Sequence, residues 1–247
     1  MQTTDYISTL AYEGRLFADV AAQTDPAAPV PGCPGWQVRD LITHLGSVHR
    51  WATGFVAEGR QEPTGLPDAP ELADDELVPW FREGHQRLVA ALSAAPADLS
   101  CWSFLPAPSP LAFWARRQAL ETAVHRVDAE SALGGDLSPL EPAFAAEGID
   151  ELLTGFHARG TSPVHTDSPK TLWIRATDVA DAAWTAHISD GPLRAERSAR
   201  QPDAVDCGYE GTAADLYLVL WNRLPLEAVR ITGDAGVARL WRDLTST

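Results

Sequence analysis

"AFWARRQALETAVHRVDAE", residues 112–130, is a run of good helix formers without proline or glycine. Glu121 and His125 stand four residues apart in it, so on a helix they lie on one face, about one turn apart. A helix can present two metal ligands in this way. It can equally carry a solvated polar pair at the same spacing, and the spacing leaves both interpretations open.

The composition is that of an ordinary globular protein, with 247 residues, 45% hydrophobic residues and a formal net charge of −15. The negative charge argues against a nucleic-acid partner, because neutralising phosphates requires basic patches. No stretch approaches the ~20 apolar residues that a membrane span needs, and the N-terminus does not resemble a signal peptide. We therefore expect a cytoplasmic monomer with no membrane partner.

Three cysteines stand far apart in the sequence, at Cys33, Cys101 and Cys207. Their odd number and the lack of a C-x-x-C pair predict neither a disulfide framework nor a structural zinc knuckle. We expect Cys33 to be a small buried thiol.

Apolar residues recur at helical spacing in four segments that are separated by proline-rich loops. These segments span residues 4–24, 36–58, 74–95 and 112–132. Pro79 should lie in the first turn of the third helix, or that helix should start near residue 79. Four helices joined by loops predict a four-helix bundle.

The pattern changes after a fifth predicted helix over residues 143–160, which should end at Gly160. Short segments rich in β-branched and aromatic residues then predict strands, with two more helices among them. The strands are expected over 171–177, 182–189, 204–210 and 228–233, and the helices over 211–224 and 234–244. We therefore predict an α+β protein, with a metal-binding helical bundle over 1–160 and a smaller α+β domain over 161–247.

A metal site in a bundle takes its ligands from facing helices, so a third ligand is expected outside residues 112–130. His44 is the best candidate, because it borders Leu41 and Leu45 of the expected core-facing stripe. A histidine in that place is also commonly a satisfied core residue. His49 is rotated by about 140° from His44 on the same helix, so it cannot easily share one ion with it.

Two imidazoles and one carboxylate leave a coordination position open. This donor set is typical of catalytic zinc, and ferrous iron accepts it too. A structural zinc site needs four protein ligands, so the sequence favours a catalytic metal if one is bound.

Two segments, "CPGWQVRDLITHLGSVHRWA" (33–52) and "ARRQALETAVHRVDAE" (115–130), resemble the hallmark segments of the mycothiol-dependent maleylpyruvate isomerase family, within the DinB-like superfamily. The segment "GTAADLYLVLWNRLP" and the later "VRITGD" resemble that family's second, sterol-carrier-like domain. The resemblance implies a DinB-like bundle followed by a sterol-carrier-like α+β domain. Carried over by motif, it implies zinc ligands at His44, Glu121 and His125.

The resemblance also implies a catalytic arginine in the second domain, and Arg223 is the best match, although Asn222 stands where many relatives have glycine. Arg223 would bind a substrate carboxylate with its planar fork, or it caps the end of its helix. Asp128 is a candidate to orient an imidazole, or it pairs with Arg116. A thiol such as mycothiol would be held on zinc as a thiolate, add to an activated cis double bond, allow rotation and leave.

We expect from this a zinc-dependent enzyme that uses a low-molecular-weight thiol such as mycothiol. It would be an isomerase or a thiol S-transferase acting on a small electrophilic carboxylate. The alternative is a non-catalytic small-molecule or partner-binding module that retains the metal site. Metal-dependent hydrolysis is a third possibility, and it needs a general base that the sequence does not identify.

Overall fold

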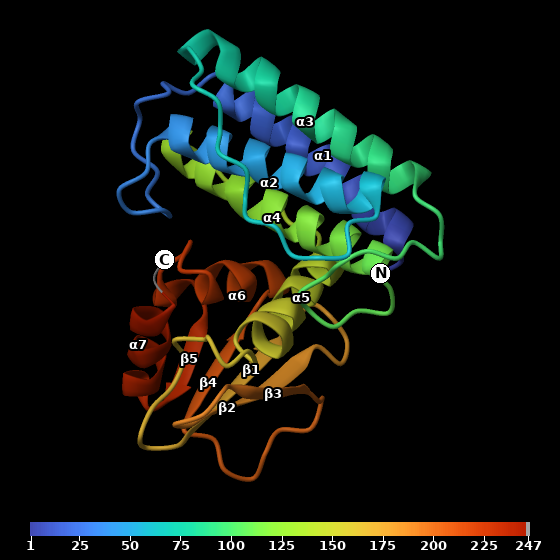
Figure 1. Cartoon of the computed structure of the whole chain (residues 1–247). Helices are drawn as coiled ribbons and strands as arrows, with labels where there is room; N and C mark the ends of the chain where they lie inside the picture. The colour runs from blue at the N-terminus through green and yellow to red at the C-terminus, as the bar shows by residue number, and fades with distance from the viewer. Residues whose placement is uncertain (246–247) are drawn as a thin grey trace. The chain divides into compact units, whose positions relative to one another are not determined.

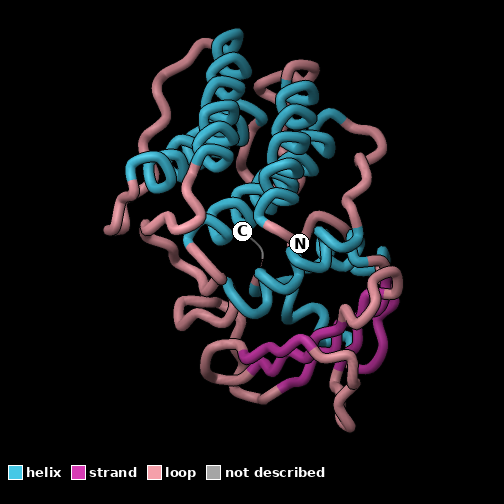
Figure 2. Tube along the Cα trace, turned by 90° about the vertical axis from the view of Figure 1, so that its right-hand side faces the viewer, coloured by secondary structure: helices cyan, strands magenta, loops and turns pink. Residues whose placement is uncertain are grey.

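The computed structural model describes residues 1–245 and divides into two compact units, Met1–Ser138 and the chain from Pro139 onward. The first unit is helical, and the strands belong to the second unit (Figure 2). This organisation is the predicted α+β fold. Among the described residues, no helix is long and apolar enough to cross a lipid bilayer.

The first unit is the predicted four-helix bundle (Figure 1). Its helices are α1 (Thr3–Ala21), α2 (Val38–Glu58), α3 (Asp74–Ala94) and α4 (Pro110–Leu133). Each helix packs mainly on two others, so that both α1 and α2 contact α3 and α4. Most side chains of α4 between residues 113 and 130 are buried, which makes α4 the most enclosed helix of the bundle.

Local capping sets where the site-bearing helices begin. At the start of α2 the Gln37 amide donates to the Asp40 carboxylate at 2.8 Å, and at the start of α4 the Ala112 amide donates to Ser109 Oγ at 3.1 Å. Pro110 occupies the first turn of α4, where its missing N–H costs nothing. These caps fix the phase of both helices and so the direction in which His44 and Glu121 point.

Pro79 lies in the second turn of α3, because this helix begins at Asp74. The prediction that Pro79 stands in the first turn, or that the helix starts near it, was therefore wrong. Three acidic residues in the first turn favour the earlier start by interacting with the helix dipole. The proline ring then removes only one N–H donor near the N-terminal end.

A buried ion cluster fixes α4 against α1. The fully buried Arg126 donates through Nε to Glu13 at 2.8 Å and through Nη1 to Glu130 at 2.7 Å. Arg126 Nη1 also donates to the Ser138 carbonyl at 2.9 Å, and the Ser138 amide donates to Glu130 at 3.0 Å. Removing one partner would leave another charge buried without compensation, so this cluster resists any rotation of α4.

The second unit contains a five-stranded sheet in the order β3-β2-β1-β4-β5, with β1 and β4 parallel and the other neighbours antiparallel. The strands are β1 (Lys170–Ala176), β2 (Ala183–Ile188), β3 (Arg194–Arg197), β4 (Cys207–Gly211) and β5 (Arg230–Gly233). The helices are α5 (Pro142–Asp150), its π-helical continuation η1 (Glu151–Phe156), α6 (Ala213–Leu220), the 3-10 turn η2 (Leu226–Ala228) and α7 (Ala235–Leu244).

One face of the sheet forms the core of this unit. Ile174 pairs with Trp184 on one side and Tyr209 on the other, and all three are fully buried. The Trp184 indole N–H donates to Asp150 at the end of α5, and the Tyr209 hydroxyl donates to the Ala238 carbonyl in α7. The helices of this unit therefore cover one face of the sheet.

The structure departs from the sequence prediction at three places in this half of the chain. The compact units divide after Ser138, whereas the prediction placed the boundary after residue 160, because α5 packs on α6 and so belongs to the second unit. Strand β3 was not predicted, since its sequence RAER is charged and suits an edge strand. The helical run also ends at Phe156, before Gly160.

Candidate metal centre

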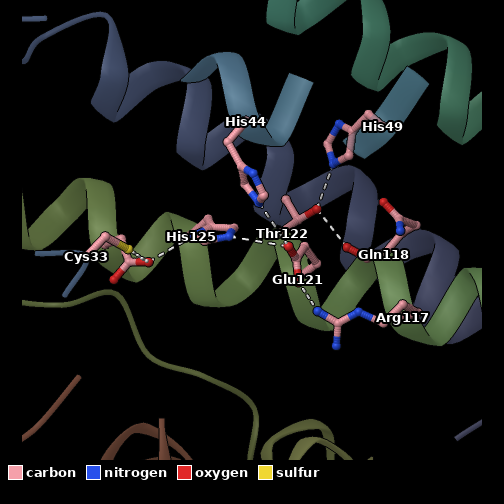
Figure 3. A network of polar contacts seen from close by, with 9 residues as sticks. Cys33, His44, His49, Arg117, Gln118, Glu121, Thr122 and His125 are labelled. Atoms are coloured by element: carbon pink, nitrogen blue, oxygen red, sulfur yellow. Dashed lines mark hydrogen bonds and ion pairs between the residues drawn. The ribbon is translucent and has the colours of Figure 1, made fainter. Parts of the chain in front are cut away.

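The first unit brings together His44 of α2 with Glu121 and His125 of α4 (Figure 3). His44 Nε2 and His125 Nε2 both lie 3.4 Å from Glu121 Oε1. The two imidazole rings meet edge to face, with centroids 5.1 Å apart. One ligand atom from each residue lies within 4.8 Å of the other two. The three candidate ligands predicted from the sequence are therefore neighbours in space.

The second oxygen of Glu121 is held by its own helix. Arg117, one turn earlier on α4, donates through Nη2 to Glu121 Oε2. The Arg117 side chain is nearly buried, so the guanidinium is shielded from solvent. The arrangement leaves Glu121 Oε1 directed at the two histidines, and the i, i+4 spacing of Arg117 and Glu121 is typical of an ion pair on one helix face.

The second ring nitrogen of His125 is also engaged. His125 Nδ1 lies 2.9 Å from Asp128 Oδ2, and Asp128 is fully buried. A carboxylate accepts, so we assign the proton to Nδ1, which leaves the lone pair on Nε2 facing His44 and Glu121. Cys33 Sγ donates to the same Asp128 oxygen at 3.4 Å. Of the two roles predicted for Asp128, the structure shows the contact that orients an imidazole.

Trp36 packs against both imidazoles. Its ring centroid lies 5.0 Å from that of His44 and 6.4 Å from that of His125, with which it is nearly parallel. The preceding Gly35 has a φ of +86°, a conformation that favours glycine and turns the chain just before α2. Trp36 was not predicted to belong to the site, although the sequence contains the Pro-Gly-Trp turn before α2.

The pKa shifts of the two histidines have different causes. Burial, and then the positive charges of His125 and Arg117, lower the pKa of His44 to about 4, so its imidazole is neutral at pH 7. Burial also lowers the pKa of His125, but the hydrogen bond to Asp128 and the contact with Cys33 outweigh it, so the net shift is upward. The hydrogen bond that stabilises charge on His125 also makes its Nε2 a better donor to a cation.

The three candidate ligands are reachable from solvent. Their side chains are exposed by 29% for His44, 20% for Glu121 and 10% for His125. The cluster thus lies at the edge of the core, where a cation and a small molecule can enter. A site of three protein ligands with an open side is the arrangement of catalytic zinc.

His49 does not join this cluster, as its helical phase predicted. It is fully buried, and its Nε2 lies 2.9 Å from Thr122 Oγ1. The Thr122 hydroxyl donates to the Gln118 carbonyl at 2.7 Å, so His49 must be the donor to Thr122. His49 is therefore a core histidine that is bonded through Nε2, while its buried Nδ1 has no hydrogen-bond partner among the described residues.

Arg223 belongs to the second unit, where it follows α6. Its Nη1 donates to the Trp221 carbonyl at 2.8 Å, which is the capping contact considered from the sequence. Asn222 has a φ of +59°, in the left-handed region that helix ends favour for glycine or asparagine. Asparagine tolerates this conformation better than most other non-glycine residues.

Comparison with known families and structures agrees with this fold. The family model described as the mycothiol maleylpyruvate isomerase N-terminal domain matches residues 9–130, and the MDMPI C-terminal domain matches residues 143–240. Crystal structures of the mycothiol-dependent maleylpyruvate isomerase and of a histidine-to-alanine mutant match with a TM-score of 0.64, at 14% and 13% identity. Each alignment covers 94% of this chain and 93% of the other.

A search of curated protein sequences found no match. At 13–14% identity the two crystal structures establish the fold and not the reaction. The two family models together span most of the sequence, one on each compact unit. The chain belongs to the mycothiol-dependent maleylpyruvate isomerase family.

Proposed function

We propose that this protein is a zinc-dependent enzyme in which a low-molecular-weight thiol, mycothiol or a close analogue, attacks a small electrophilic carboxylate. One observation carries the proposal: ligand atoms of His44, Glu121 and His125 converge within 4.8 Å at a place that solvent reaches. Isomerisation is the first reaction to test, because both similar crystal structures are of an isomerase. Thiol S-transfer is the second.

The donor set fits zinc. Two imidazole nitrogens and one carboxylate oxygen are common zinc ligands, and three of them leave a position for an exogenous group. Another divalent metal such as ferrous iron accepts the same donors. Zinc bound here would lower the pKa of a thiol in the open position and hold its sulfur as a thiolate.

The residues around the ligands would keep them in place. Arg117 holds one oxygen of Glu121, and Asp128 holds the Nδ1 proton of His125, so each ligand presents a defined atom. The Trp36 ring packs against both imidazoles. We further propose that Arg223 binds the substrate carboxylate, with its planar fork matched to the two oxygens.

The test begins with the metal. Full-length protein purified without chelator or added metal is analysed by plasma mass spectrometry beside the His44→Ala, His125→Ala double variant. About one zinc or iron per chain, lost in the double variant, is expected. The matched control is His85→Gln, which changes a buried histidine of the same bundle away from the cluster.

The loaded protein is then assayed with mycothiol and maleylpyruvate for isomerisation, and with other electrophilic carboxylates for thiol transfer. Turnover that depends on both thiol and metal supports the enzyme. A chain that neither contains metal nor takes up added zinc contradicts it and favours the non-catalytic binding module. The cytoplasmic location and the monomeric state stay predictions.

A further inference from the structure

We propose that Cys33 is a positioning residue that acts through Asp128 on His125. Cys33 Sγ lies 3.4 Å from Asp128 Oδ2, and His125 Nδ1 lies 2.9 Å from the same oxygen. The three residues are 7%, 0% and 8% exposed, so the contact is closed to solvent. The consequence for zinc rests on the proposed function, whereas the hydrogen-bond chain itself does not.

Because Asp128 is buried, each hydrogen bond that its carboxylate accepts helps to compensate for lost hydration. A buried carboxylate is costly unless hydrogen bonds compensate for the lost water, and at 0% exposure water cannot replace a missing donor. A thiol is a weak donor, but its hydrogen bond is strengthened when the acceptor is charged. Removing the Cys33 thiol would therefore loosen Asp128, and with it the orientation of the His125 ring.

The turn that precedes α2 places Cys33 at this point. The Cys33 amide donates to the Val30 carbonyl at 3.1 Å, and the Trp36 amide donates to the Cys33 carbonyl at 3.0 Å. One short turn therefore supports His125 twice, with the thiol behind Asp128 and with the Trp36 ring stacked on the imidazole. Cys33 lies 95 residues before Asp128 in the sequence, so only the fold brings them together.

The same three residues could instead hold a cation themselves, since their ligand atoms lie within 4.8 Å of one another. The 2.9 Å separation of His125 Nδ1 and Asp128 Oδ2 is a hydrogen-bond distance, and the burial of all three residues leaves no open side. Both observations favour the positioning role. The metal count per chain distinguishes the two roles.

The first experiment uses metal-free, full-length protein labelled with ¹⁵N-histidine. NMR records the ring nitrogens of His125, assigned through their loss in His125→Gln. We expect Cys33→Ala to shift the His125 Nδ1 signal, Cys33→Ser to shift it less because serine still donates, and Cys101→Ala to leave it unchanged. Cys101 is a matched control, since it is exposed by the same 7% in the same unit.

Thermal unfolding shows whether each variant is folded. Cys33→Val, which fills the space without donating, replaces Cys33→Ala if the latter does not fold. A His125 spectrum that is the same in Cys33→Ala and Cys101→Ala overturns the proposal. This measurement needs no zinc, so it decides the proposal even if the chain binds no metal and the proposed function fails.

The second experiment measures zinc affinity by competition with a chromophoric chelator. Loss of a partner that orients a ligand weakens metal binding by roughly 10–100-fold, which we expect for Asp128→Asn. Cys33→Ala, one contact further away, should weaken it by about three- to tenfold, with Cys33→Ser close to the wild type. In the Asp128→Asn background, Cys33→Ala should cause no further loss of zinc affinity, because both substitutions act on the same hydrogen-bond chain to His125.

If Cys33→Ala weakens zinc binding as much in the Asp128→Asn background as in the wild type, Cys33 does not act through Asp128. Two zinc ions per chain, falling to one in Cys33→Ala, make Cys33 a ligand of a second metal and also overturn the proposal. Cobalt substitution gives a separate check, because a thiolate ligand would add a charge-transfer band that the positioning role does not produce. We expect one metal and no such band from Cys33.

Discussion

His44 and His49 stand five residues apart on α2 and both meet α4, yet the structure gives them opposite surroundings (Figure 3). The His44 side chain is 29% exposed and faces the carboxylate of Glu121. His49 is fully buried and donates to the hydroxyl of Thr122. Glu121 and Thr122 are consecutive on α4, about 100° apart around the helix.

The comparison teaches that the facing residue and the reach of solvent decide what a histidine can do. A carboxylate beside a partly exposed imidazole gives two ligand atoms that a cation can reach. The Thr122 hydroxyl already donates its hydrogen to a backbone carbonyl, so it can only accept a hydrogen bond from the buried His49 imidazole. It provides no second metal ligand. The same residue type on the same helix is thus a candidate ligand in one place and a packing residue in the other.

The largest expected effect comes from removing the partly exposed histidine. His44→Ala should weaken zinc binding by about 3–5 kcal/mol, roughly a third of the binding free energy of a structural zinc site, which is roughly 150- to 5,000-fold. The unfolding free energy of the metal-free chain should change little. Chelator competition and urea titration measure the two quantities, and unchanged zinc affinity would make His44 a packing residue like His49.

For the buried His49 we expect a large effect on stability and no effect on zinc binding. His49→Ala removes a fully buried ring and should lower the unfolding free energy by about 2–4 kcal/mol, while the zinc stoichiometry stays the same. Urea titration of the metal-free protein checks the first result and plasma mass spectrometry the second. Loss of metal in a folded His49→Ala chain would erase the distinction between the two histidines.

The pH dependence of stability sharpens the comparison further. Burial, and then the charges of His85 and Arg50, hold the pKa of His49 well below its ordinary value. Below pH 6.5 the unfolded chain therefore gains a proton that folded His49 does not, so stability is lost as the pH falls. This residue should contribute up to about 1.4 kcal/mol per pH unit between pH 6 and 5. In urea titrations at pH 7, 6 and 5, the unfolding free energy of His49→Gln should fall less steeply with decreasing pH than that of the wild type. Equal pH dependence of the two proteins would contradict this account.

The smallest effect is expected at the residue that faces His49. Thr122→Val keeps the shape but leaves the buried His49 N–H without its acceptor, which should cost about 1–2 kcal/mol in unfolding free energy. Thr53→Val is the control, because the Thr53 hydroxyl donates to the His49 carbonyl of its own helix and a change below about 0.5 kcal/mol is expected. Equal effects of the two substitutions would show that the His49–Thr122 contact adds nothing.

The features that a short sequence window contains could be predicted. The apolar stripe of α2, from Val38 to Val48, is buried as its spacing indicated. The pairing of Arg117 with Glu121 and the contact of His125 with Asp128 also follow from helical spacing on α4. His44 was the best third candidate because it borders the apolar stripe of α2, the family motif pointed to the same residue, and the bundle places it beside Glu121.

Features that depend on distant pairing could not be predicted in this way. Strand β3 is charged, and it is a strand only because β2 offers it a partner edge. Cys33 and Trp36 come from a loop and reach His125 through the path of the chain, which no spacing encodes. The role of α5 likewise depends on its packing against α6, since its sequence suits either domain.

The ion cluster of Arg126, Glu13 and Glu130 also limits where residues can be inserted into or deleted from this protein. It fixes the rotation of α4 immediately after the candidate ligands Glu121 and His125. One residue inserted or deleted between the candidate ligands and the ion cluster would rotate one group by about 100° around the helix relative to the other. Insertions and deletions among relatives should therefore be absent from residues 116–130, and they should collect in the exposed loop over 59–73.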